Sequence, residues 1–243
     1  MRLQGKTALI TGGGSGIGAA CALALAEEGC RGAICGRQAS TLAETAARHK
    51  GEPPILTRVC DVADRKAARE LVAWAEQELG RIDILLNAAG VNVPNRTFKD
   101  LSPEDWDRLL AINTTGAFHT IFFASPAMRA RKDGLIVNIG STAGKRANSL
   151  GGIAYNASKF ALAGLSTSAS DEFREDGVRV TTIHPGEVET PILRFRAKSP
   201  TPEHRAKMMQ PEDVAAAVLL VCTLPARANV LEMVIKPTAQ AFV

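Results

Sequence analysis

Tyr155 is the only tyrosine in the chain, and Lys159 follows it by four residues. Residues four apart on a helix share one face, so the Lys159 ammonium would lie beside the Tyr155 phenol. A free phenol has a pKa of about 10, and a nearby positive charge favours its ionised form. Such a pair could give a proton to a developing alkoxide, or take one from an alcohol, near neutral pH. The spacing alone also fits a surface Tyr and Lys one turn apart, so other motifs must decide.

A glycine-rich segment, Thr11 to Gly18, has a composition that suits phosphate binding. It follows an apolar run and precedes a helical stretch that starts at Ala19. A glycine turn between a strand and a helix lets backbone N–H groups approach a pyrophosphate at the positive helix end. The alternative is a tight turn that needs glycine only for its dihedral angles. We interpret the segment, with its Gly-x-x-x-Gly-x-Gly spacing, as a phosphate-binding turn.

The elements that must position these residues alternate along the chain. Short runs rich in Val, Ile and Leu are separated by longer helical stretches, which predicts an α/β fold around a seven-stranded parallel sheet. The expected strands are Thr7–Ile10, Ala33–Cys35, Ile55–Cys60, Ile82–Leu86, Leu135–Ile139, Arg179–Ile183 and Leu231–Ile235. Because no linker divides the chain, we expect residues 1–243 to form one domain. Residues 187–210 contain three prolines and many charges, and we expect a mobile loop with a short helix.

Composition and charge argue against several classes of function. The net charge of +4 is scattered along the chain, whereas nucleic-acid binding usually requires a clustered basic face. The longest apolar run, Val214 to Cys222, is too short to span a membrane. The five cysteines form no Cys-x-x-Cys motif and favour reduced thiols in a cytoplasmic protein. The four histidines lack metal-ligand spacing, so we expect no metal site.

Several motifs in order resemble those of the compact, single-domain short-chain dehydrogenase/reductase family, and the resemblance covers nearly the whole chain. It implies a Rossmann-type, doubly wound parallel sheet with helices on both faces. It departs from the family pattern at Ala88, where the family has a second asparagine. By resemblance, the cofactor-binding residues are Gly12, Ser15, Gly16, Ile17, Gly18, Asp61, Val62, Asn87, Gly90, Tyr155, Lys159, Pro185, Gly186, Val188 and Thr190.

The same resemblance implies a catalytic role for each of four residues. Tyr155 would be the acid/base that protonates a carbonyl oxygen as hydride arrives from the nicotinamide. Lys159 would lower the pKa of Tyr155 and bind the nicotinamide ribose. Ser141 would donate a hydrogen bond to the substrate oxygen. Asn113 would hold a water on a proton relay that ends at Lys159, and its side chain could also bond helix backbone at a kink.

The end of the second strand carries the signal for cofactor choice. NAD-preferring relatives have an acidic residue there, which binds the ribose 2′-hydroxyl. This chain has Gly36 followed by Arg37, and a guanidinium suits the 2′-phosphate of NADP. We therefore expect NADP(H) to be preferred over NAD(H). A solvated Arg37 is the alternative, and many NADP-dependent relatives have a basic residue where this chain has Ser15.

The substrate is less well defined by the sequence. The expected flap over the active site is basic, which fits either a solvated loop or recognition of an anionic substrate; its basic residues are Arg194, Arg196, Lys198, His204, Arg205 and Lys207. Carrier-protein reductases of similar fold commonly have a basic residue where this chain has Asp176. The C-terminal tail resembles that of hydroxy-acid and 3-hydroxy amino-acid dehydrogenases, which favours a small β-hydroxy or keto acid.

Alternative functions and assembly also follow from the resemblance. The resemblance favours a carbonyl reductase or alcohol dehydrogenase, and three alternatives remain. They are a non-catalytic NADP(H)-binding sensor or scaffold, a 3-oxoacyl-carrier-protein reductase-like enzyme, and a sugar epimerase or dehydratase. Relatives are usually tetramers, so we expect a homo-oligomer, either a tetramer or a dimer. Small residues that would permit close helix packing follow Tyr155; they are Ala157, Ser158, Ala161, Gly164, Ser166 and Ser168.

Overall fold

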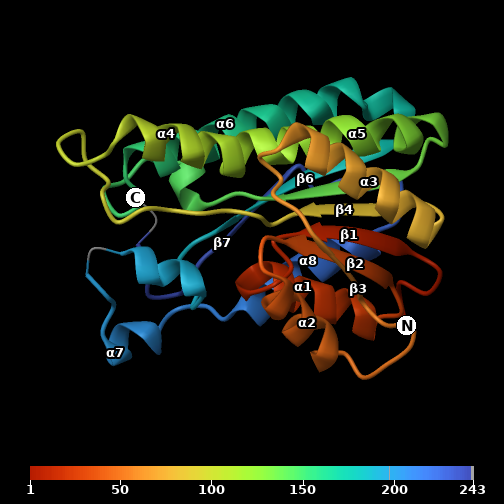
Figure 1. Ribbon diagram of the computed structural model, residues 1–243, viewed down its shortest axis with the longest axis horizontal. Helices are drawn as coiled ribbons and strands as arrows, with labels where there is room; N and C mark the ends of the chain where they lie inside the picture. The colour runs from red at the N-terminus through yellow and green to blue at the C-terminus, as the bar shows by residue number, and fades with distance from the viewer. Residues whose placement is uncertain (197, 242–243) are drawn as a thin grey trace.

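The computed structural model describes residues 1–196 and 198–241 and has one seven-stranded, all-parallel sheet at its centre (Figure 1). The strands are β1 Thr7–Thr11, β2 Arg31–Gly36, β3 Leu56–Val59, β4 Ile84–Asn87, β5 Gly134–Ile139, β6 Val178–Pro185 and β7 Glu232–Ile235. Each overlaps an expected strand, with ends that differ by no more than two residues. The predicted Rossmann-type doubly wound sheet is therefore confirmed.

The spatial order of the strands is β3-β2-β1-β4-β5-β6-β7. The chain runs outward from β1 to β3, and then returns to the other side of β1 and runs outward from β4 to β7. Loops at the carboxyl ends of β1 and β4 consequently turn in opposite directions and leave a crevice between them. The fold thus predicts a binding site at the carboxyl edge of β1 and β4.

Helices cover both faces of the sheet, with α3 to α6 on one side and α1, α2 and α8 on the other (Figure 1). The helices are α1 Gly16–Glu27, α2 Ala39–Arg48, α3 Arg65–Leu79, α4 Pro103–Leu110, α5 Gly116–Ala130, α6 Ile153–Glu172, α7 Pro202–Arg205 and α8 Pro211–Thr223. The central strands β1, β4, β5 and β6 are buried on both faces, as a continuous apolar sequence in a parallel sheet requires. The edge strands β3 and β7 are partly exposed. Each helical layer encloses its own apolar core.

Local sequence signals explain where several helices begin and end. Ser102 caps α4 by accepting a hydrogen bond from the Asp105 N–H at 3.1 Å, and Pro103 is the first helical residue. Gly80 ends α3 in the left-handed conformation, with φ of 82°. One irregular element, the π-helical turn Ala111–Thr115, joins α4 to α5. It lies beside the catalytic candidates described below.

The expected flap at 187–210 leaves the sheet after β6 and returns to it before α8. A parallel bridge between Val188 and Met209 joins its two ends. Between them lie the short 3₁₀ helix Pro191–Phe195 and α7, so the segment contains short helices, as expected. Residue 197 lies outside the described residues. Among the described helices, none combines the length and apolar character needed to cross a membrane.

Candidate active site

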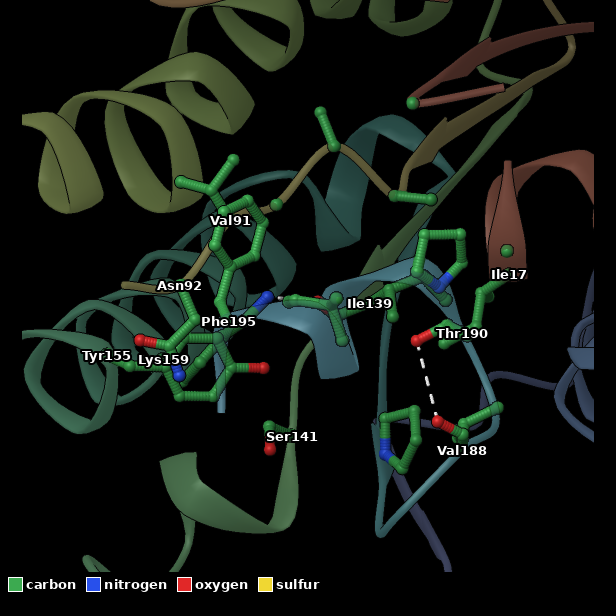
Figure 2. Close-up of a pocket in the computed structure, with 18 of the residues that line it drawn as sticks. Ile17, Val91, Asn92, Ile139, Ser141, Tyr155, Lys159, Val188, Thr190 and Phe195 are labelled. Atoms are coloured by element: carbon green, nitrogen blue, oxygen red, sulfur yellow. Dashed lines mark hydrogen bonds between the residues drawn. The ribbon is translucent and has the colours of Figure 1, made fainter. Parts of the chain in front are cut away.

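A cavity of about 1000 Å³ opens at the carboxyl edge of the sheet, where the topology predicts it. It extends from the glycine turn after β1 to the flap after β6, and Figure 2 shows its inner part. Most of the residues expected from the sequence line it, namely Gly12, Ser15, Gly16, Ile17, Gly18, Arg37, Asp61, Val62, Gly90, Ser141, Tyr155, Lys159, Pro185, Gly186, Val188 and Thr190. Two expected residues, Asn87 and Asn113, lie behind this lining.

The glycine turn is shaped by close approaches of its own backbone. A Cβ atom at Gly18 would collide with the carbonyl oxygen of Gly12. Gly12 itself has φ of 69°, and a Cβ there would lie 2.7 Å from the backbone nitrogen of Ala89. The N-cap of α1, Ser15, makes no side-chain capping bond, so the first N–H groups of the helix remain available to an anion. This backbone-lined turn fits the diphosphate of a dinucleotide.

Tyr155 and Lys159 lie one turn apart near the start of α6, and Ser141 follows β5 (Figure 2). The Lys159 Nζ atom is 5.7 Å from the centroid of the Tyr155 ring and donates a hydrogen bond to the Ile139 carbonyl oxygen at 2.8 Å. The Lys159 side chain is buried, and burial lowers its pKa to about 8. The predicted shared face of the Tyr-Lys pair is confirmed, and both side chains border one cavity.

Burial dominates the electrostatics of Tyr155. Burial raises the pKa of Tyr155 above its ordinary value, and the hydrogen bond with Ser141 and the positive charge of Arg96 only partly oppose this. Desolvation therefore outweighs the groups that favour the phenolate, and the expected effect of Lys159 on this pKa stays a prediction. The phenol is therefore in its protonated, acid form at neutral pH.

Asn113 lies in the π-helical turn and is 1% exposed. Its Oδ1 atom accepts a hydrogen bond from the Val91 N–H at 2.8 Å, and its Nδ2 group donates to the Val91 carbonyl oxygen and to Ser158 Oγ, each at 3.0 Å. The extra backbone residue of a π turn re-aims this side chain toward the loop after β4. Asn113 thus ties the wall of the cavity to α6, and its relay role stays a prediction.

Asn87 supports the cavity wall from inside the protein. It ends β4, donates to Asn138 Oδ1 at 2.9 Å and accepts a hydrogen bond from the Thr120 hydroxyl at 2.7 Å. Its side chain therefore joins β4 to β5 and α5. Because its polar groups have protein partners, any direct contribution to cofactor binding would come from its backbone.

Arg96 is a residue of this site that sequence reasoning missed. Its guanidinium donates hydrogen bonds to the carbonyl oxygens of Val93 at 2.8 Å, Phe195 at 2.7 Å and Leu150. These three carbonyls belong to the loops after β4, β6 and β5, respectively. A Cβ at Gly152 would lie 2.5 Å from Arg96 Cβ, so the arginine packs directly on the residue before α6. Arg96 thereby holds three loops around Tyr155.

The flap is neutralised in part by its own carboxylates. Arg196 and His204 both contact Glu187 Oε2, at 2.9 Å and 2.8 Å, and Arg205 contacts Glu189 at 2.7 Å. Burial by itself would raise the pKa of Glu187, but hydrogen bonds from His204 and Arg196, with their charges, lower it. Three of the six basic flap residues named above are therefore paired with acidic residues of the same segment.

The C-terminal tail closes the cavity beside the Pro185-Gly186 segment. Gln240 Oε1 accepts a hydrogen bond from the Glu187 N–H at 2.9 Å, and Lys236 Nζ donates to the Gln240 carbonyl oxygen at 2.6 Å. A Cβ at Gly186 would collide with the Gln240 side chain. The sequence gives little indication of the contact between Gln240 and the Glu187 N–H. Its signal is an amide side chain at the end of the tail segment Pro237-Thr238-Ala239-Gln240. The described residues contain no cluster of metal-ligating side chains.

Comparison with known proteins is consistent with this geometry. Residues 6–200 match the family model described as short chain dehydrogenase. An uncharacterized oxidoreductase of Staphylococcus saprophyticus is 33% identical over 239 residues, which cover 98% of this chain and 99% of that protein.

Two solved structures are also similar over nearly their full length. The closed form of serine dehydrogenase complexed with NADP+ has a TM-score of 0.87 and 30% identity, covering 97% of this chain and 96% of that one. The 3-ketoacyl-(acyl-carrier-protein) reductase from Brucella melitensis complexed with NADH has a TM-score of 0.87 and 25% identity, covering 97% and 98%.

Proposed function

Because the chain belongs to the short-chain dehydrogenase family, we propose that it is an NADP(H)-dependent oxidoreductase acting on a carbonyl or secondary alcohol. The observation that carries this proposal is the meeting of Tyr155, Ser141 and Lys159 in a cavity that begins at a backbone-lined glycine turn. A phenol, a hydroxyl and an ammonium around one space are the groups that carbonyl reduction needs.

The proposed mechanism assigns one task to each side chain. When bound, the nicotinamide cofactor supplies or accepts the hydride. Tyr155, a phenol that is protonated at neutral pH and whose pKa burial raises further, gives its proton to the carbonyl oxygen during reduction. Ser141 donates a hydrogen bond to that oxygen as negative charge develops. Lys159 holds a positive charge beside the phenol and stabilises the phenolate that remains.

We propose that the cofactor is NADP(H) rather than NAD(H). Gly36 and the exposed Arg37 line the cavity with Gly14, Ser15 and Thr41. A guanidinium at this edge can bind a 2′-phosphate by charge-assisted hydrogen bonds. The neighbouring structures hold either cofactor, so this assignment depends on Arg37.

A small β-hydroxy or keto acid is the proposed substrate class. Arg96 and Arg146 line the cavity, and the positive charge of Arg96 acts on Tyr155, which favours a substrate with a carboxylate. Burial and the charge of Arg196 lower the pKa of Arg96, the expected effect of two guanidinium groups near one another. The similarity to serine dehydrogenase, whose named substrate is a small β-hydroxy acid, agrees with this class.

Two alternatives are tested by the same experiments. A carrier-protein reductase-like enzyme would accept 3-oxoacyl thioesters, and the similarity to the Brucella reductase keeps it as the second candidate. A non-catalytic sensor would bind the cofactor without turnover. We also propose that residues 187–210 act as a substrate flap within a single domain.

A homo-oligomer in the cytoplasm is the proposed state of the protein. Exposed phenylalanines on α5 and α6, namely Phe118, Phe122 and Phe160, lie on the same helices as the exposed small residues Ala161 and Gly164. Exposed aromatic side chains on adjacent helices favour a contact with another subunit. The five free, buried cysteines favour a reducing compartment.

The proposal is tested first by fluorescence titration with NADPH and, separately, NADH. We expect NADPH to bind at least about tenfold more tightly, which is about 1.4 kcal/mol, and Arg37→Gln to remove this difference. Arg48→Gln, an exposed arginine on α2 outside the cavity lining, is the matched control. Equal binding of both cofactors by the wild-type protein would refute the Arg37 assignment alone.

Turnover is then measured with pairs of keto acids and their methyl esters, and with a 3-oxoacyl thioester. We expect faster reduction of the acid than of its ester. Tyr155→Phe should lower kcat by about 10²–10⁴-fold without weakening NADPH binding to a similar extent. Cofactor binding without turnover of any carbonyl would instead favour the sensor.

A further inference from the structure

His184, near the end of β6, lies directly under the loop that carries Ser141. Its side chain is 0% exposed, and its Nδ1 atom is 3.0 Å from the Ser141 carbonyl oxygen. Since a carbonyl oxygen only accepts hydrogen bonds, Nδ1 must carry the proton. The contact is close, because a Cβ at Gly140 would lie 2.8 Å from Nδ1. The ring therefore packs on the backbone of the residue that precedes Ser141.

This contact occurs where the β5–β6 ladder ends. The Gly140 N–H donates to the Ile183 carbonyl oxygen at 2.7 Å, and beyond it the two strands separate. The Ser141 carbonyl oxygen accepts from the Gly144 N–H at 2.9 Å, within its own 3₁₀ turn, and from His184. His184 is thus the group that connects the Ser141 carbonyl to the neighbouring strand.

The other side of the His184 ring faces an ion pair. Glu232, on β7, has Oε1 3.7 Å from His184 Nε2, and its Oε2 atom is 2.7 Å from Lys145 Nζ. Nε2 has no hydrogen-bond partner among the described residues. Burial lowers the pKa of His184, although the Ser141 carbonyl and Glu232 oppose this effect. In the neutral ring, Nε2 presents a lone pair to the carboxylate, and the Lys145 ammonium offsets that negative charge.

We propose that His184 is a positioning residue for the reaction. Its Nδ1–H holds the backbone of Ser141 so that the serine hydroxyl stays on the Tyr155 side of the cavity, and the Glu232–Lys145 pair holds the same loop from β7. The inference rests on the proposed carbonyl reduction. Displacing a catalytic group by about 1 Å can cost about 100-fold in rate. A serine freed from this anchor would bond less well to both the phenol and the substrate oxygen.

A pair of neutral, polar substitutions separates the proposed role from simple packing. In His184→Asn, the amide nitrogen is as many bonds from the Cα atom as Nδ1 is in histidine, so it can still donate to the Ser141 carbonyl oxygen. In His184→Gln, the amide reaches toward Glu232 and the donor to Ser141 is lost. We expect H184Q to lower kcat by about 10–100-fold and H184N to remain within about threefold of wild type. The dissociation constant of NADPH should change little in either variant.

The single tyrosine of the chain gives a second readout that needs no turnover. Ionisation of a phenol changes its ultraviolet absorbance, so an absorbance titration reports the pKa of Tyr155 alone. The Ser141 hydrogen bond lowers that pKa, so H184Q should have a higher Tyr155 pKa than wild type, while H184N should match wild type. Glu172→Gln, which removes another carboxylate paired with a cation at 2.8 Å, is the control for Glu232→Gln.

Each outcome decides the inference. An unchanged Tyr155 pKa in H184Q, or equal losses in H184Q and H184N, would refute it, because a packing role alone would affect both variants. If no carbonyl is reduced even by the wild-type protein, the proposed function fails, and the absorbance titration still tests whether His184 positions Ser141. A smaller loss of kcat in E232Q than in H184Q, with no loss in E172Q, would support the whole network.

Discussion

Replacing Asn113 with alanine separates its structural role from its expected place on a proton relay. The side chain makes hydrogen bonds to both backbone groups of Val91 and to Ser158 Oγ. Ser158 keeps a partner in Asn113→Ala, because its hydroxyl also donates to the Tyr155 carbonyl oxygen at 2.8 Å. The Val91 N–H and C=O groups lose their amide partner in a wall that is 8% exposed at Val91.

The cost follows from these two backbone groups. A buried polar group left without a partner costs about 1–3 kcal/mol, so the two together cost about 2–6 kcal/mol before water enters. For a protein of this size, 1 kcal/mol corresponds to about 2–4 °C in Tm. With partial rescue by water, we expect Asn113→Ala to lower Tm by about 5–15 °C. Because Val91 and Gly90 both line the cavity, NADPH binding should weaken as well.

The assay is thermal unfolding followed by circular dichroism, with NADPH titration and turnover of the same samples. Asn95→Ala is the matched control, since Asn95 is an exposed asparagine of the same loop. A Tm within about 2 °C of wild type, together with a large loss of kcat, would refute the structural argument. That result would leave the water relay as the main role of Asn113.

Two further predictions concern pH and the glycine turn. Lys159 carries its positive charge below its pKa of about 8 and loses it above, so kcat for reduction should be steady below pH 8 and fall above it. In Lys159→Arg the guanidinium stays charged, so the variant should have a lower kcat than wild type but keep that kcat to higher pH. If kcat fell at the same pH in the wild type and in the variant, the fall could not be assigned to Lys159. Gly18→Ala should weaken NADPH binding at least about tenfold, because its Cβ would collide with the Gly12 carbonyl oxygen. Gly164→Ala is the control, because a Cβ there meets nothing within 4 Å, and it should leave NADPH binding unchanged. Equal effects of the two substitutions would argue against a tight turn at Gly18.

The sequence predicted the parts of this protein that depend on neighbouring residues. The strands follow from continuous apolar runs, and the start of α4 follows from Ser102 and Pro103, which act within one turn. The Tyr155–Lys159 pair likewise depends only on helical spacing. The π turn at Ala111–Thr115 could not be predicted in this way, because the extra residue is accommodated by contacts between Asn113 and a distant loop.

Long-range contacts explain why Arg96 and Gln240 were missed. Arg96 meets carbonyls that lie 54 and 99 residues away along the chain, and Gln240 meets an N–H group 53 residues away. Their partners are backbone atoms, which have no signature in the amino-acid sequence. His184 is similar, since its partner at Ser141 is a carbonyl oxygen 43 residues away.

The basic flap shows how a correct composition can still mislead about charge. The sequence contains the acids Glu187 and Glu189 in the same segment as the six basic residues, but their pairing depends on how the flap folds back on itself. Once Arg196, His204 and Arg205 are paired, less positive charge remains on the flap for a substrate than its composition indicates. Arg96, in the loop after β4, supplies a further positive charge in the cavity wall. Its guanidinium lies between three loops beside Tyr155. For the proposed anionic substrate, we therefore expect Arg96 in the cavity wall to supply more of the positive charge than the flap does.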